Sequence, residues 1–327
     1  MTSLPHFSAQ RIWSQAEHNA FTDLAWFEHA WWCVFREANT HVSGDGCIRL
    51  LRSEDGTHWQ SEQLFEAAGD LRDPKLMVNP EGQLIVFAAL KVSRETFGYS
   101  HQVYAWQRIA ANNWQGPTAI GEQDLWLWRV TFHGKTGLGV AYKVGGDSHT
   151  RLYQTTDGVN YQHVLERLRG SDLRDEYSNE SGLCFDPDGT AWCLLRRDPE
   201  HGLLGSAKPP YTQWHWHTCN QRIGGPVMVR LDDGRLLAVV RLYGYTDGEL
   251  TSARTSFVWV CRETGQLTEC GTLPSAGDTS YAGLVVRDCV AYVSYYSSHE
   301  ADSIENSPAI YFAAVPLHEL ASAEPAL

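Results

Sequence analysis

The most regular feature of the chain is a set of short apolar runs that recur at a nearly constant spacing. Six such runs occupy residues 31–35, 83–90, 136–142, 190–195, 235–240 and 290–296. Their first residues are 52, 53, 54, 45 and 55 positions apart. Each run has the length of a single buried β-strand, and a repeat of this size without a long helical stretch is typical of an array of β-sheets.

A second apolar segment precedes every run. These segments occupy residues 24–27, 75–78, 128–132, 182–185, 227–231 and 283–286. Several pairs are joined by turn-forming residues, namely Pro-Glu-Gly at 80–82, Asp-Pro-Asp-Gly at 186–189 and Asp-Asp-Gly at 232–234. Six hairpins at a fixed period, in a unit with room for four strands, predict an all-β, six-bladed β-propeller with four-stranded antiparallel blades. We expect one propeller domain over residues 1–327, with residues 317–327 as a C-terminal tail.

The composition fits such a fold and limits the possible ligands. Hydrophobic residues make up 43% of the chain and aromatic residues 12%, which is ample for a packed β-sheet core. The formal net charge is -13, so the long-range field repels nucleic acid and anionic membrane surfaces, and we expect neither as a partner. An anionic ligand would have to be held by a local cluster of Arg or Lys side chains.

Cysteine usage and the N-terminal sequence favour a cytoplasmic protein. The eight cysteines form no CxxC pair and several lie in apolar runs, which indicates buried thiols rather than a disulfide framework. No basic stretch followed by an apolar core opens the sequence, and its longest apolar run is too short to span a bilayer. The alternating Trp-His-Trp-His at 214–217 has no second pair of ligands, so we expect neither a metal nor another cofactor.

The antiparallel topology of a blade gathers charged residues at one face. The start of the first strand and the end of the second lie at the same edge. Residues just before the first strands are Asp23, Asp73, Glu180 and Tyr281. Residues that end the second strands are Arg36, Lys91, Lys143, Arg196 or Arg197, and Arg241. Because guanidinium groups bind carboxylates through parallel N–H bonds, these cations predict an anion-binding pocket.

Two turn segments, at 53–59 and 155–161, share the pattern Ser/Thr-x-Asp-Gly-x-x-aromatic. In such a turn the Asp side chain accepts backbone N–H bonds, and the ring fixes the turn to its blade. The pattern resembles the Asp box, or BNR repeat, of the sialidase (neuraminidase) superfamily. It stabilises structure, so it indicates the fold and not an activity.

Residues 179–196 resemble the fourth-blade region of sialidases, where Asn-Glu is followed one hairpin later by Asp-Gly and then Arg. The resemblance implies that Glu180 polarises a catalytic tyrosine and that Arg196 grips the substrate carboxylate, with Arg197 as the adjacent alternative. Residues 278–284 are similar to the sialidase segment that carries the nucleophilic tyrosine, which would be Tyr281.

The resemblance also implies two further arginines of a carboxylate-binding triad. Phe35-Arg36 resembles the start of the Phe/Tyr-Arg-Ile-Pro motif, although Glu and Ala follow it here. Residues 253–258 resemble the strand of the third arginine, which gives Arg254, with Arg241 as the alternative.

In sialidases the general acid is an Asp on the loop after the first arginine. The corresponding loop, residues 37–49, is short and contains Asp45 as its one Asp, with His41 and Glu37 as alternatives. Arg72-Asp73 supplies a further cation and carboxylate expected on the same face.

The resemblance implies a retaining exo-α-sialidase-like glycosidase that acts on a terminal nonulosonic acid of a sialylated or other acidic glycan. A carboxylate nucleophile would approach the substrate's own carboxylate, which explains the use of tyrosine. A phenol with a pKa of about 10 needs a neighbouring base, here Glu180. Two alternatives stay open. One is a propeller lyase or hydrolase of uronate glycans, with Tyr281 as base and His41 assisting, and the other is a non-catalytic propeller that binds acidic glycans.

Overall fold

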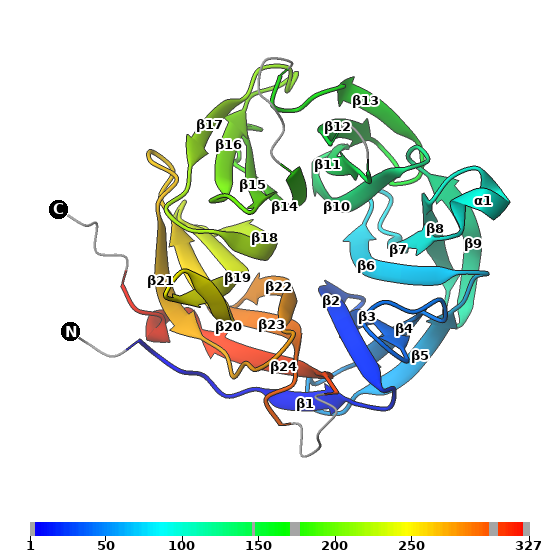
Figure 1. Ribbon diagram of the computed structural model, residues 1–327, viewed down its shortest axis with the longest axis horizontal. Coiled ribbons are helices and arrows are strands. Elements are labelled where there is room, and N and C mark those ends of the chain that lie inside the picture. The colour runs from blue at the N-terminus through cyan, green and yellow to red at the C-terminus, as the bar shows by residue number, and fades with distance from the viewer. Residues whose placement is uncertain (1–3, 146–147, 171–176, 301–306, 323–327) are drawn as a thin grey trace.

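The computed structural model describes residues 4–145, 148–170, 177–300 and 307–322. Its strands form six four-stranded antiparallel sheets, arranged as the blades of a ring (Figure 1). The fold is therefore the six-bladed β-propeller that the apolar pattern predicted.

The strands of successive blades occupy equivalent positions. The first, innermost strands are β2 (His18–Phe27), β6 (Asp70–Val78), β10 (Leu125–His133), β14 (Tyr177–Phe185), β18 (Ile223–Arg230) and β22 (Ser280–Arg287). The second strands are β3 (Ala30–Ala38), β7 (Leu84–Lys91), β11 (Thr136–Lys143), β15 (Ala191–Asp198), β19 (Leu236–Thr246) and β23 (Val290–Ser297). The third strands are β4 (Cys47–Ser53), β8 (His101–Ala110), β12 (Thr150–Thr155), β16 (Leu203–Ala207), β20 (Glu249–Val260) and β24 (Ala309–Pro316). The outer strands are β5 (Gln60–Phe65), β9 (Asn113–Ile120), β13 (Tyr161–Leu165), β17 (His215–Thr218), β21 (Leu267–Thr272) and β1 (Gln10–Trp13).

The outer strand of the sixth blade comes from the other end of the chain. β1 pairs antiparallel with β24 (Figure 1). In this pairing Gln10 lies opposite Phe312. The ring is thus closed by backbone hydrogen bonds between the two ends of the propeller, a feature that the repeat did not predict.

Short helical turns lie outside the blades. α1 (Arg94–Phe97) lies between β7 and β8, and the 3₁₀ turn η1 (Leu317–Glu319) follows β24. Beyond η1 the chain docks on the fifth blade, because the Ala321 N–H donates to Cys270 O and its carbonyl accepts from Trp259. The predicted tail thus contacts the propeller through Ala321, and its residues 323–327 lie outside the described residues.

The hydrophobic core is divided among the junctions between blades. Each of six clusters of buried side chains combines residues from two neighbouring blades. Where the sixth blade meets the first, an added Cβ at Gly283 would lie 2.1 Å from Leu24 N, so only glycine allows this approach. Because a single blade cannot bury its own faces, the strands are stabilised by the closed ring.

Every first strand contains the same irregularity at one point. The register with the second strand shifts between Ala20 and Asp23 in the first blade, and the equivalent shift occurs in all five others. A β-bulge of this kind bends the strand and redirects a side chain out of its alternating pattern. Three of these bulges contain residues that the sequence analysis predicted for the site, namely Asp73, Glu180 and Tyr281.

The two turns with the Ser/Thr-x-Asp-Gly pattern have the hydrogen bonds expected of them. Asp55 Oδ1 accepts from the backbone N–H groups of Thr57 and His58, each at 2.8 Å. Asp157 Oδ1 likewise accepts from Val159 and Asn160 at 2.8 Å.

The described part of the chain contains neither a disulfide nor a helix that could cross a membrane. All eight cysteines are free thiols and five of them are buried. No helix in the described part of the chain is both long and apolar enough to cross a bilayer.

Candidate active site

The bulges of three blades present a phenol and two carboxylates to one cavity. Asp73, Glu180 and Tyr281 all line it. Asp73 and Tyr281 have positive φ angles of 48° and 47°, and Gly225 at the equivalent bulge of the fifth blade has a φ of 53°. Left-handed backbone at non-glycine residues is strained, and such strain concentrates at functional sites.

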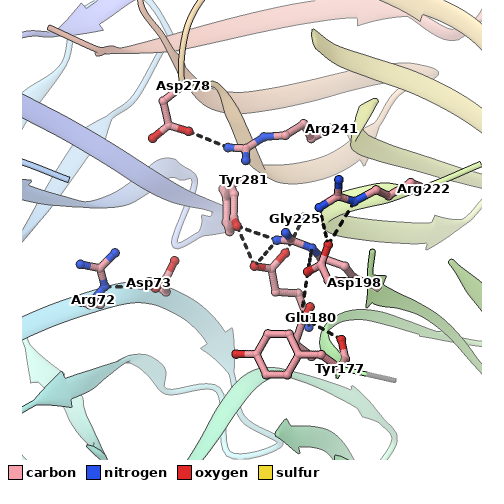
Figure 2. Close-up of polar contacts among 12 residues, drawn as sticks. Arg72, Asp73, Tyr177, Glu180, Asp198, Arg222, Gly225, Arg241, Asp278 and Tyr281 are labelled. Carbon is pink, nitrogen blue, oxygen red and sulfur yellow. Dashed lines mark hydrogen bonds and ion pairs between the residues drawn. The ribbon is translucent and has the colours of Figure 1, made fainter. Parts of the chain in front are cut away.

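The centre of the site is a contact between Tyr281 and Glu180, whose side chains point toward each other (Figure 2). The Tyr281 hydroxyl donates to Glu180 Oε1 at 2.6 Å. Arg196 donates to the same carboxylate oxygen at 2.7 Å and to the phenol oxygen at 2.9 Å. The other oxygen of Glu180 accepts the Gly225 N–H at 2.7 Å. The carboxylate is therefore placed to take the phenolic proton, and Arg196 to stabilise the phenolate.

Ionisation states around this contact follow from burial. Burial, with the nearby Glu180 carboxylate, raises the pKa of Tyr281 well above its usual value, so the phenol is protonated at neutral pH. Burial also raises the pKa of Asp73. The cavity thus contains a carboxyl group that is biased toward its protonated form.

Arg196 is held by a second carboxylate. Its Nε lies 2.8 Å from Asp198 Oδ2, and Arg222 contacts the other oxygen of Asp198 at 2.7 Å. Burial alone would raise the pKa of Asp198, but the charges of Arg196 and Arg222 lower it. The guanidinium of Arg196 is therefore fixed in place by two anions.

A second guanidinium covers the ring of the tyrosine. The Arg241 guanidinium carbon lies 4.8 Å from the Tyr281 ring centroid, a cation–π contact. The same side chain donates to Asp278 at 2.8 Å (Figure 2). It also donates to the Tyr296 hydroxyl at 2.9 Å. Arg241 thereby links the phenol to a further carboxylate, Asp278.

The cavity has a volume of about 260 Å³. This is just below the range usual for drug-sized ligands, so it suits a molecule such as a single sugar. Its aromatic wall consists of Phe21, Trp126, Trp128 and Tyr142. A larger cavity of about 490 Å³ is lined by the innermost strands of all six blades. The smaller one is the better candidate because the phenol and both carboxylates lie in it.

Seven of the residues predicted from the sequence are brought together here. They are Tyr281, Glu180, Asp73, Arg72, His41, Arg196 and Arg241. Arg72 lies between Asp73 Oδ2, 3.9 Å from its Nε, and Asp70 Oδ2, 3.0 Å from Nη1.

Three of the predicted arginines lie elsewhere. Arg254, which the resemblance predicts for the third triad position, is bonded through Nε and Nη2 to Glu269 at 2.8 Å. The alternative, Arg241, lies beside the phenol instead. Arg197 donates to His201 O, since it points to the other face of β15 from Arg196. Arg36 is fully buried and bonded to Asp70 at 2.8 Å, so it lies beneath the site instead of lining it.

The carboxylates Asp45, Glu37 and Asp23 also lie outside this cavity. Asp45 is exposed, and hydrogen bonds from Ser43 and then the Asn39 backbone lower its pKa, the opposite of what a general acid needs. Glu37 is bonded to Arg49 at 2.9 Å. Asp23 lines the larger cavity and accepts from Arg129 at 2.7 Å.

Several residues of the site were not predicted because no motif in the sequence marks them. Asp198 and Asp278 have no local motif, although Asp278 begins the segment that contains Tyr281. Lys75 is buried 4.4 Å from the Trp128 ring centroid and donates to Asp73 O at 3.3 Å. Burial lowers the pKa of Lys75 to about 8. The sequence did contain one indication of Lys75, because a lysine in an apolar first strand is unusual and points to a buried charge.

One group among the described residues has the composition of a metal site. Ligand atoms of His18, His41 and Asp278 lie within 4.8 Å of one another. Arg241 donates to the same aspartate, and the charges of Arg36 and Arg72 act on His18. Three guanidinium groups around the cluster repel a cation, so we do not interpret it as a metal site.

Neither a protein-family model nor a curated protein sequence matches this chain. Solved structures do match. A protein of unknown function from Dyadobacter fermentans DSM 18053 has a TM-score of 0.74 and 14% identity over 96% of this chain and 97% of its own. The α-L-arabinanase of Penicillium chrysogenum, solved with arabinobiose, has a TM-score of 0.70 and 11% identity over 95% of this chain and 98% of its own. The NanB sialidase of Streptococcus pneumoniae has a TM-score of 0.69 and 8% identity over 95% of this chain and 71% of its own. At these identities the likeness is one of fold.

Proposed function

We propose that this protein is a retaining glycoside hydrolase that releases a terminal nonulosonic sugar, with Tyr281 as nucleophile and Glu180 as the base that activates it. The observation on which this rests is the 2.6 Å hydrogen bond from the Tyr281 hydroxyl to Glu180 Oε1, with Arg196 on the same phenol oxygen. Propeller neighbours named as a sialidase and an arabinanase support glycoside hydrolysis in general.

The chemistry follows from the positions of these groups. As the phenol oxygen attacks the anomeric carbon, the glycosidic bond breaks and its electrons stay on the departing alcohol, which is protonated as it leaves. The phenolic proton passes to Glu180 Oε1, and the Arg196 guanidinium stabilises the negative charge that develops on the phenol oxygen. Water then displaces the tyrosine from the covalent glycosyl intermediate, and the phenol recovers its proton from Glu180. Two displacements on opposite faces of the sugar retain its configuration.

An acidic sugar is the substrate that best explains a neutral nucleophile. A tyrosine with a strongly raised pKa carries no charge before it attacks, so it does not repel a substrate carboxylate on the reacting carbon. Arg72 and Lys91 line the same cavity and would bind that carboxylate. The protein would thus take a sialic acid or a related nonulosonic acid at the end of a glycan.

Trapping the intermediate tests the assignment directly. A fluorinated sialyl donor that forms the glycosyl–enzyme quickly and releases it slowly should label the peptide containing Tyr281, as read by mass spectrometry. Turnover of an aryl sialoside should vanish in Tyr281→Phe. The chain offers a matched control in Tyr153, whose hydroxyl donates to Glu122 at 2.7 Å and lies beside Arg151 outside the cavity. Tyr153→Phe should retain turnover.

A second candidate is a glycosidase for neutral sugars. Asp73 and Glu180 line one cavity, and the raised pKa of Asp73 suits a carboxylic acid that works with a carboxylate partner. In that case aryl arabinofuranosides would be cleaved and Tyr281→Phe would remain active. A lyase would instead generate a new double bond, seen as ultraviolet absorbance with uronate polymers.

A further inference from the structure

The loop between β3 and β4 carries a histidine that contacts an aspartate from another blade. His41 Nδ1 lies 2.7 Å from Asp278 Oδ2, although the two residues are 237 positions apart. His41 lines the cavity that contains Tyr281 and Glu180, and half of its side chain is exposed. The imidazole is thus at the open side of the candidate site.

Asp278 is held as a carboxylate. Its Oδ1 accepts from Arg241 and from the Tyr296 hydroxyl, each at 2.8 Å. Burial alone would raise the pKa of Asp278, but the His41 hydrogen bond and the Arg241 charge lower it to about 2. The contact with this carboxylate occupies Nδ1 of His41 and leaves Nε2 as the nitrogen available to a ligand.

The loop that carries His41 is fixed from below by two arginines. Arg36 donates to Thr40 O at 3.0 Å, and Arg72 donates to His41 O at 2.8 Å. Asp70 joins the two guanidinium groups, at 2.8 Å from Arg36 and 3.0 Å from Arg72. Arg36, which was expected to bind substrate, instead positions this loop.

Packing fixes the histidine ring relative to the nucleophile. The His41 ring meets Phe21 edge-on at a centroid distance of 5.3 Å, and Phe21 meets Tyr281 in the same way at 5.3 Å. One aromatic ring therefore separates the imidazole from the phenol. A sugar above Phe21 would have the phenol on one side and the imidazole on the other.

On the basis of the proposed function, we propose that His41 is the general acid for the leaving group and that Asp278 is its positioning residue. In the first step Nε2–H gives its proton to the glycosidic oxygen, and the electrons of the breaking bond from carbon to that oxygen stay on the departing alcohol. Tyr281 forms the new bond to the anomeric carbon. In the second step neutral His41 takes a proton from the attacking water, and the phenol leaves.

Position favours His41 over Asp73 as the donor. The glycosidic oxygen of a terminal sugar faces the mouth of the cavity, because the rest of the glycan extends into solvent. His41 is half exposed there, whereas Asp73 is 7% exposed, beside Arg72 and Lys75. A proton donor at the mouth also recovers its proton from solvent after each turnover.

The test is how the variants respond to the leaving group. A series of aryl N-acetylneuraminosides, from strongly acidic to weakly acidic phenols, would be assayed with the native chain, His41→Gln and Asp278→Asn. Loss of a general acid should lower kcat/KM by about 10²–10⁴-fold for the weakly acidic phenols and far less for the strongly acidic ones, whose departure needs no proton. Asp278→Asn should show the same selective loss with a smaller magnitude.

Control variants distinguish a failure of this proposal from a failure of the proposed function on which it rests. Asp45→Asn, on the same loop, should leave the leaving-group dependence unchanged, and thermal unfolding would verify that each variant is folded. Equal losses of His41→Gln for all phenols, or selective losses in Asp73→Asn instead, would overturn the role of His41 while leaving Tyr281 as nucleophile. If Tyr281→Phe remains active while His41→Gln loses activity only for the weakly acidic phenols, Tyr281 is not the nucleophile but His41 is still the general acid. No turnover of any sialoside by the native chain would overturn both.

Discussion

Replacing Glu180 by Gln changes a single atom at the centre of the site. The carboxylate accepts three hydrogen bonds, from Tyr281 and Arg196 on Oε1 and from Gly225 N–H on Oε2. A glutamine has one acceptor oxygen. If the glutamine NH₂ group faces Gly225, it meets the backbone N–H of Gly225, and both groups are donors. If the NH₂ group faces Arg196 instead, it meets the guanidinium N–H groups, which are donors as well. In either orientation the variant also lacks a base for the phenolic proton.

The expected magnitudes differ for catalysis and for folding. General-base catalysis contributes about 10²–10⁴-fold, which raises the activation free energy by about 3–5 kcal/mol when it is lost. The unfolding free energy should fall by only about 1–3 kcal/mol, the cost of one unsatisfied buried group. Arg196 is not left without an anion, because its Nε keeps the 2.8 Å ion pair with Asp198. Glu180→Gln should therefore be a folded and nearly inactive protein.

The assay is the release of a fluorogenic phenol from an aryl sialoside, with urea denaturation of the same preparations. Glu122→Gln is the matched control, since Glu122 accepts from Tyr153 and Arg151 in another blade. It should lose stability and keep turnover. If folded Glu180→Gln hydrolyses the sialoside within about threefold of the native rate, less than the smallest effect expected for a base, Glu180 does not activate Tyr281.

Three further outcomes are expected from urea titrations. An added Cβ at Gly283 would meet Leu24 N at 2.1 Å, so Gly283→Ala should lower the unfolding free energy by about 1–3 kcal/mol or more, and an unchanged midpoint would contradict the ring contact. Asp23→Ala removes the buried carboxylate 2.7 Å from the partly buried Arg129 and should cost about 3 kcal/mol, the lower end for a buried pair, whereas a neutral result would mean that solvent screens the arginine. Because the pKa of Asp278 is lowered to about 2, its contribution is present above the unfolded pKa of about 4 and is lost between about pH 4 and 2. The stability difference between the native chain and Asp278→Asn should shrink over that range, and a constant difference would refute the shift.

The fold was predictable because its signals are local. The second strand of each blade lies on the apolar run that predicted it, as β3 (Ala30–Ala38) does on residues 31–35. β1 was missed for the opposite reason. It has four residues, two of them polar, and its pairing with β24 joins Gln10 to Phe312, so no local periodicity reveals it.

The candidate site was predictable only as far as position along a strand determines it. Tyr281, Glu180 and Asp73 directly precede apolar segments of the sequence, and the antiparallel topology predicts that such residues meet at one face of the ring. In the structure they lie inside the first strands, at the bulges, and not before the strands as expected. The choice between Arg254 and Arg241 depended on register. Arg241 pairs with Thr255 and Arg254 with Leu242, so the two arginines lie on opposite faces of the sheet. A shift of one residue cannot be read from composition or motif.

The bulge positions explain why the site has so little sequence signature. At equivalent points the blades present Phe21, Asp73, Gly225 and Tyr281, all with positive φ. Each strained non-glycine residue costs about 1–3 kcal/mol and is retained because the packed ring determines its geometry. The bulge is the same in these blades, but the group that it presents differs. Phe21 gives the cavity an aromatic side, Asp73 a carboxyl group, Gly225 a backbone N–H donor and Tyr281 a phenol. At Gly225 a Cβ would lie 3.0 Å from Tyr281, so even the absent side chain is dictated by the neighbouring blade. The site is thus specified by contacts between blades, which only the closed ring creates.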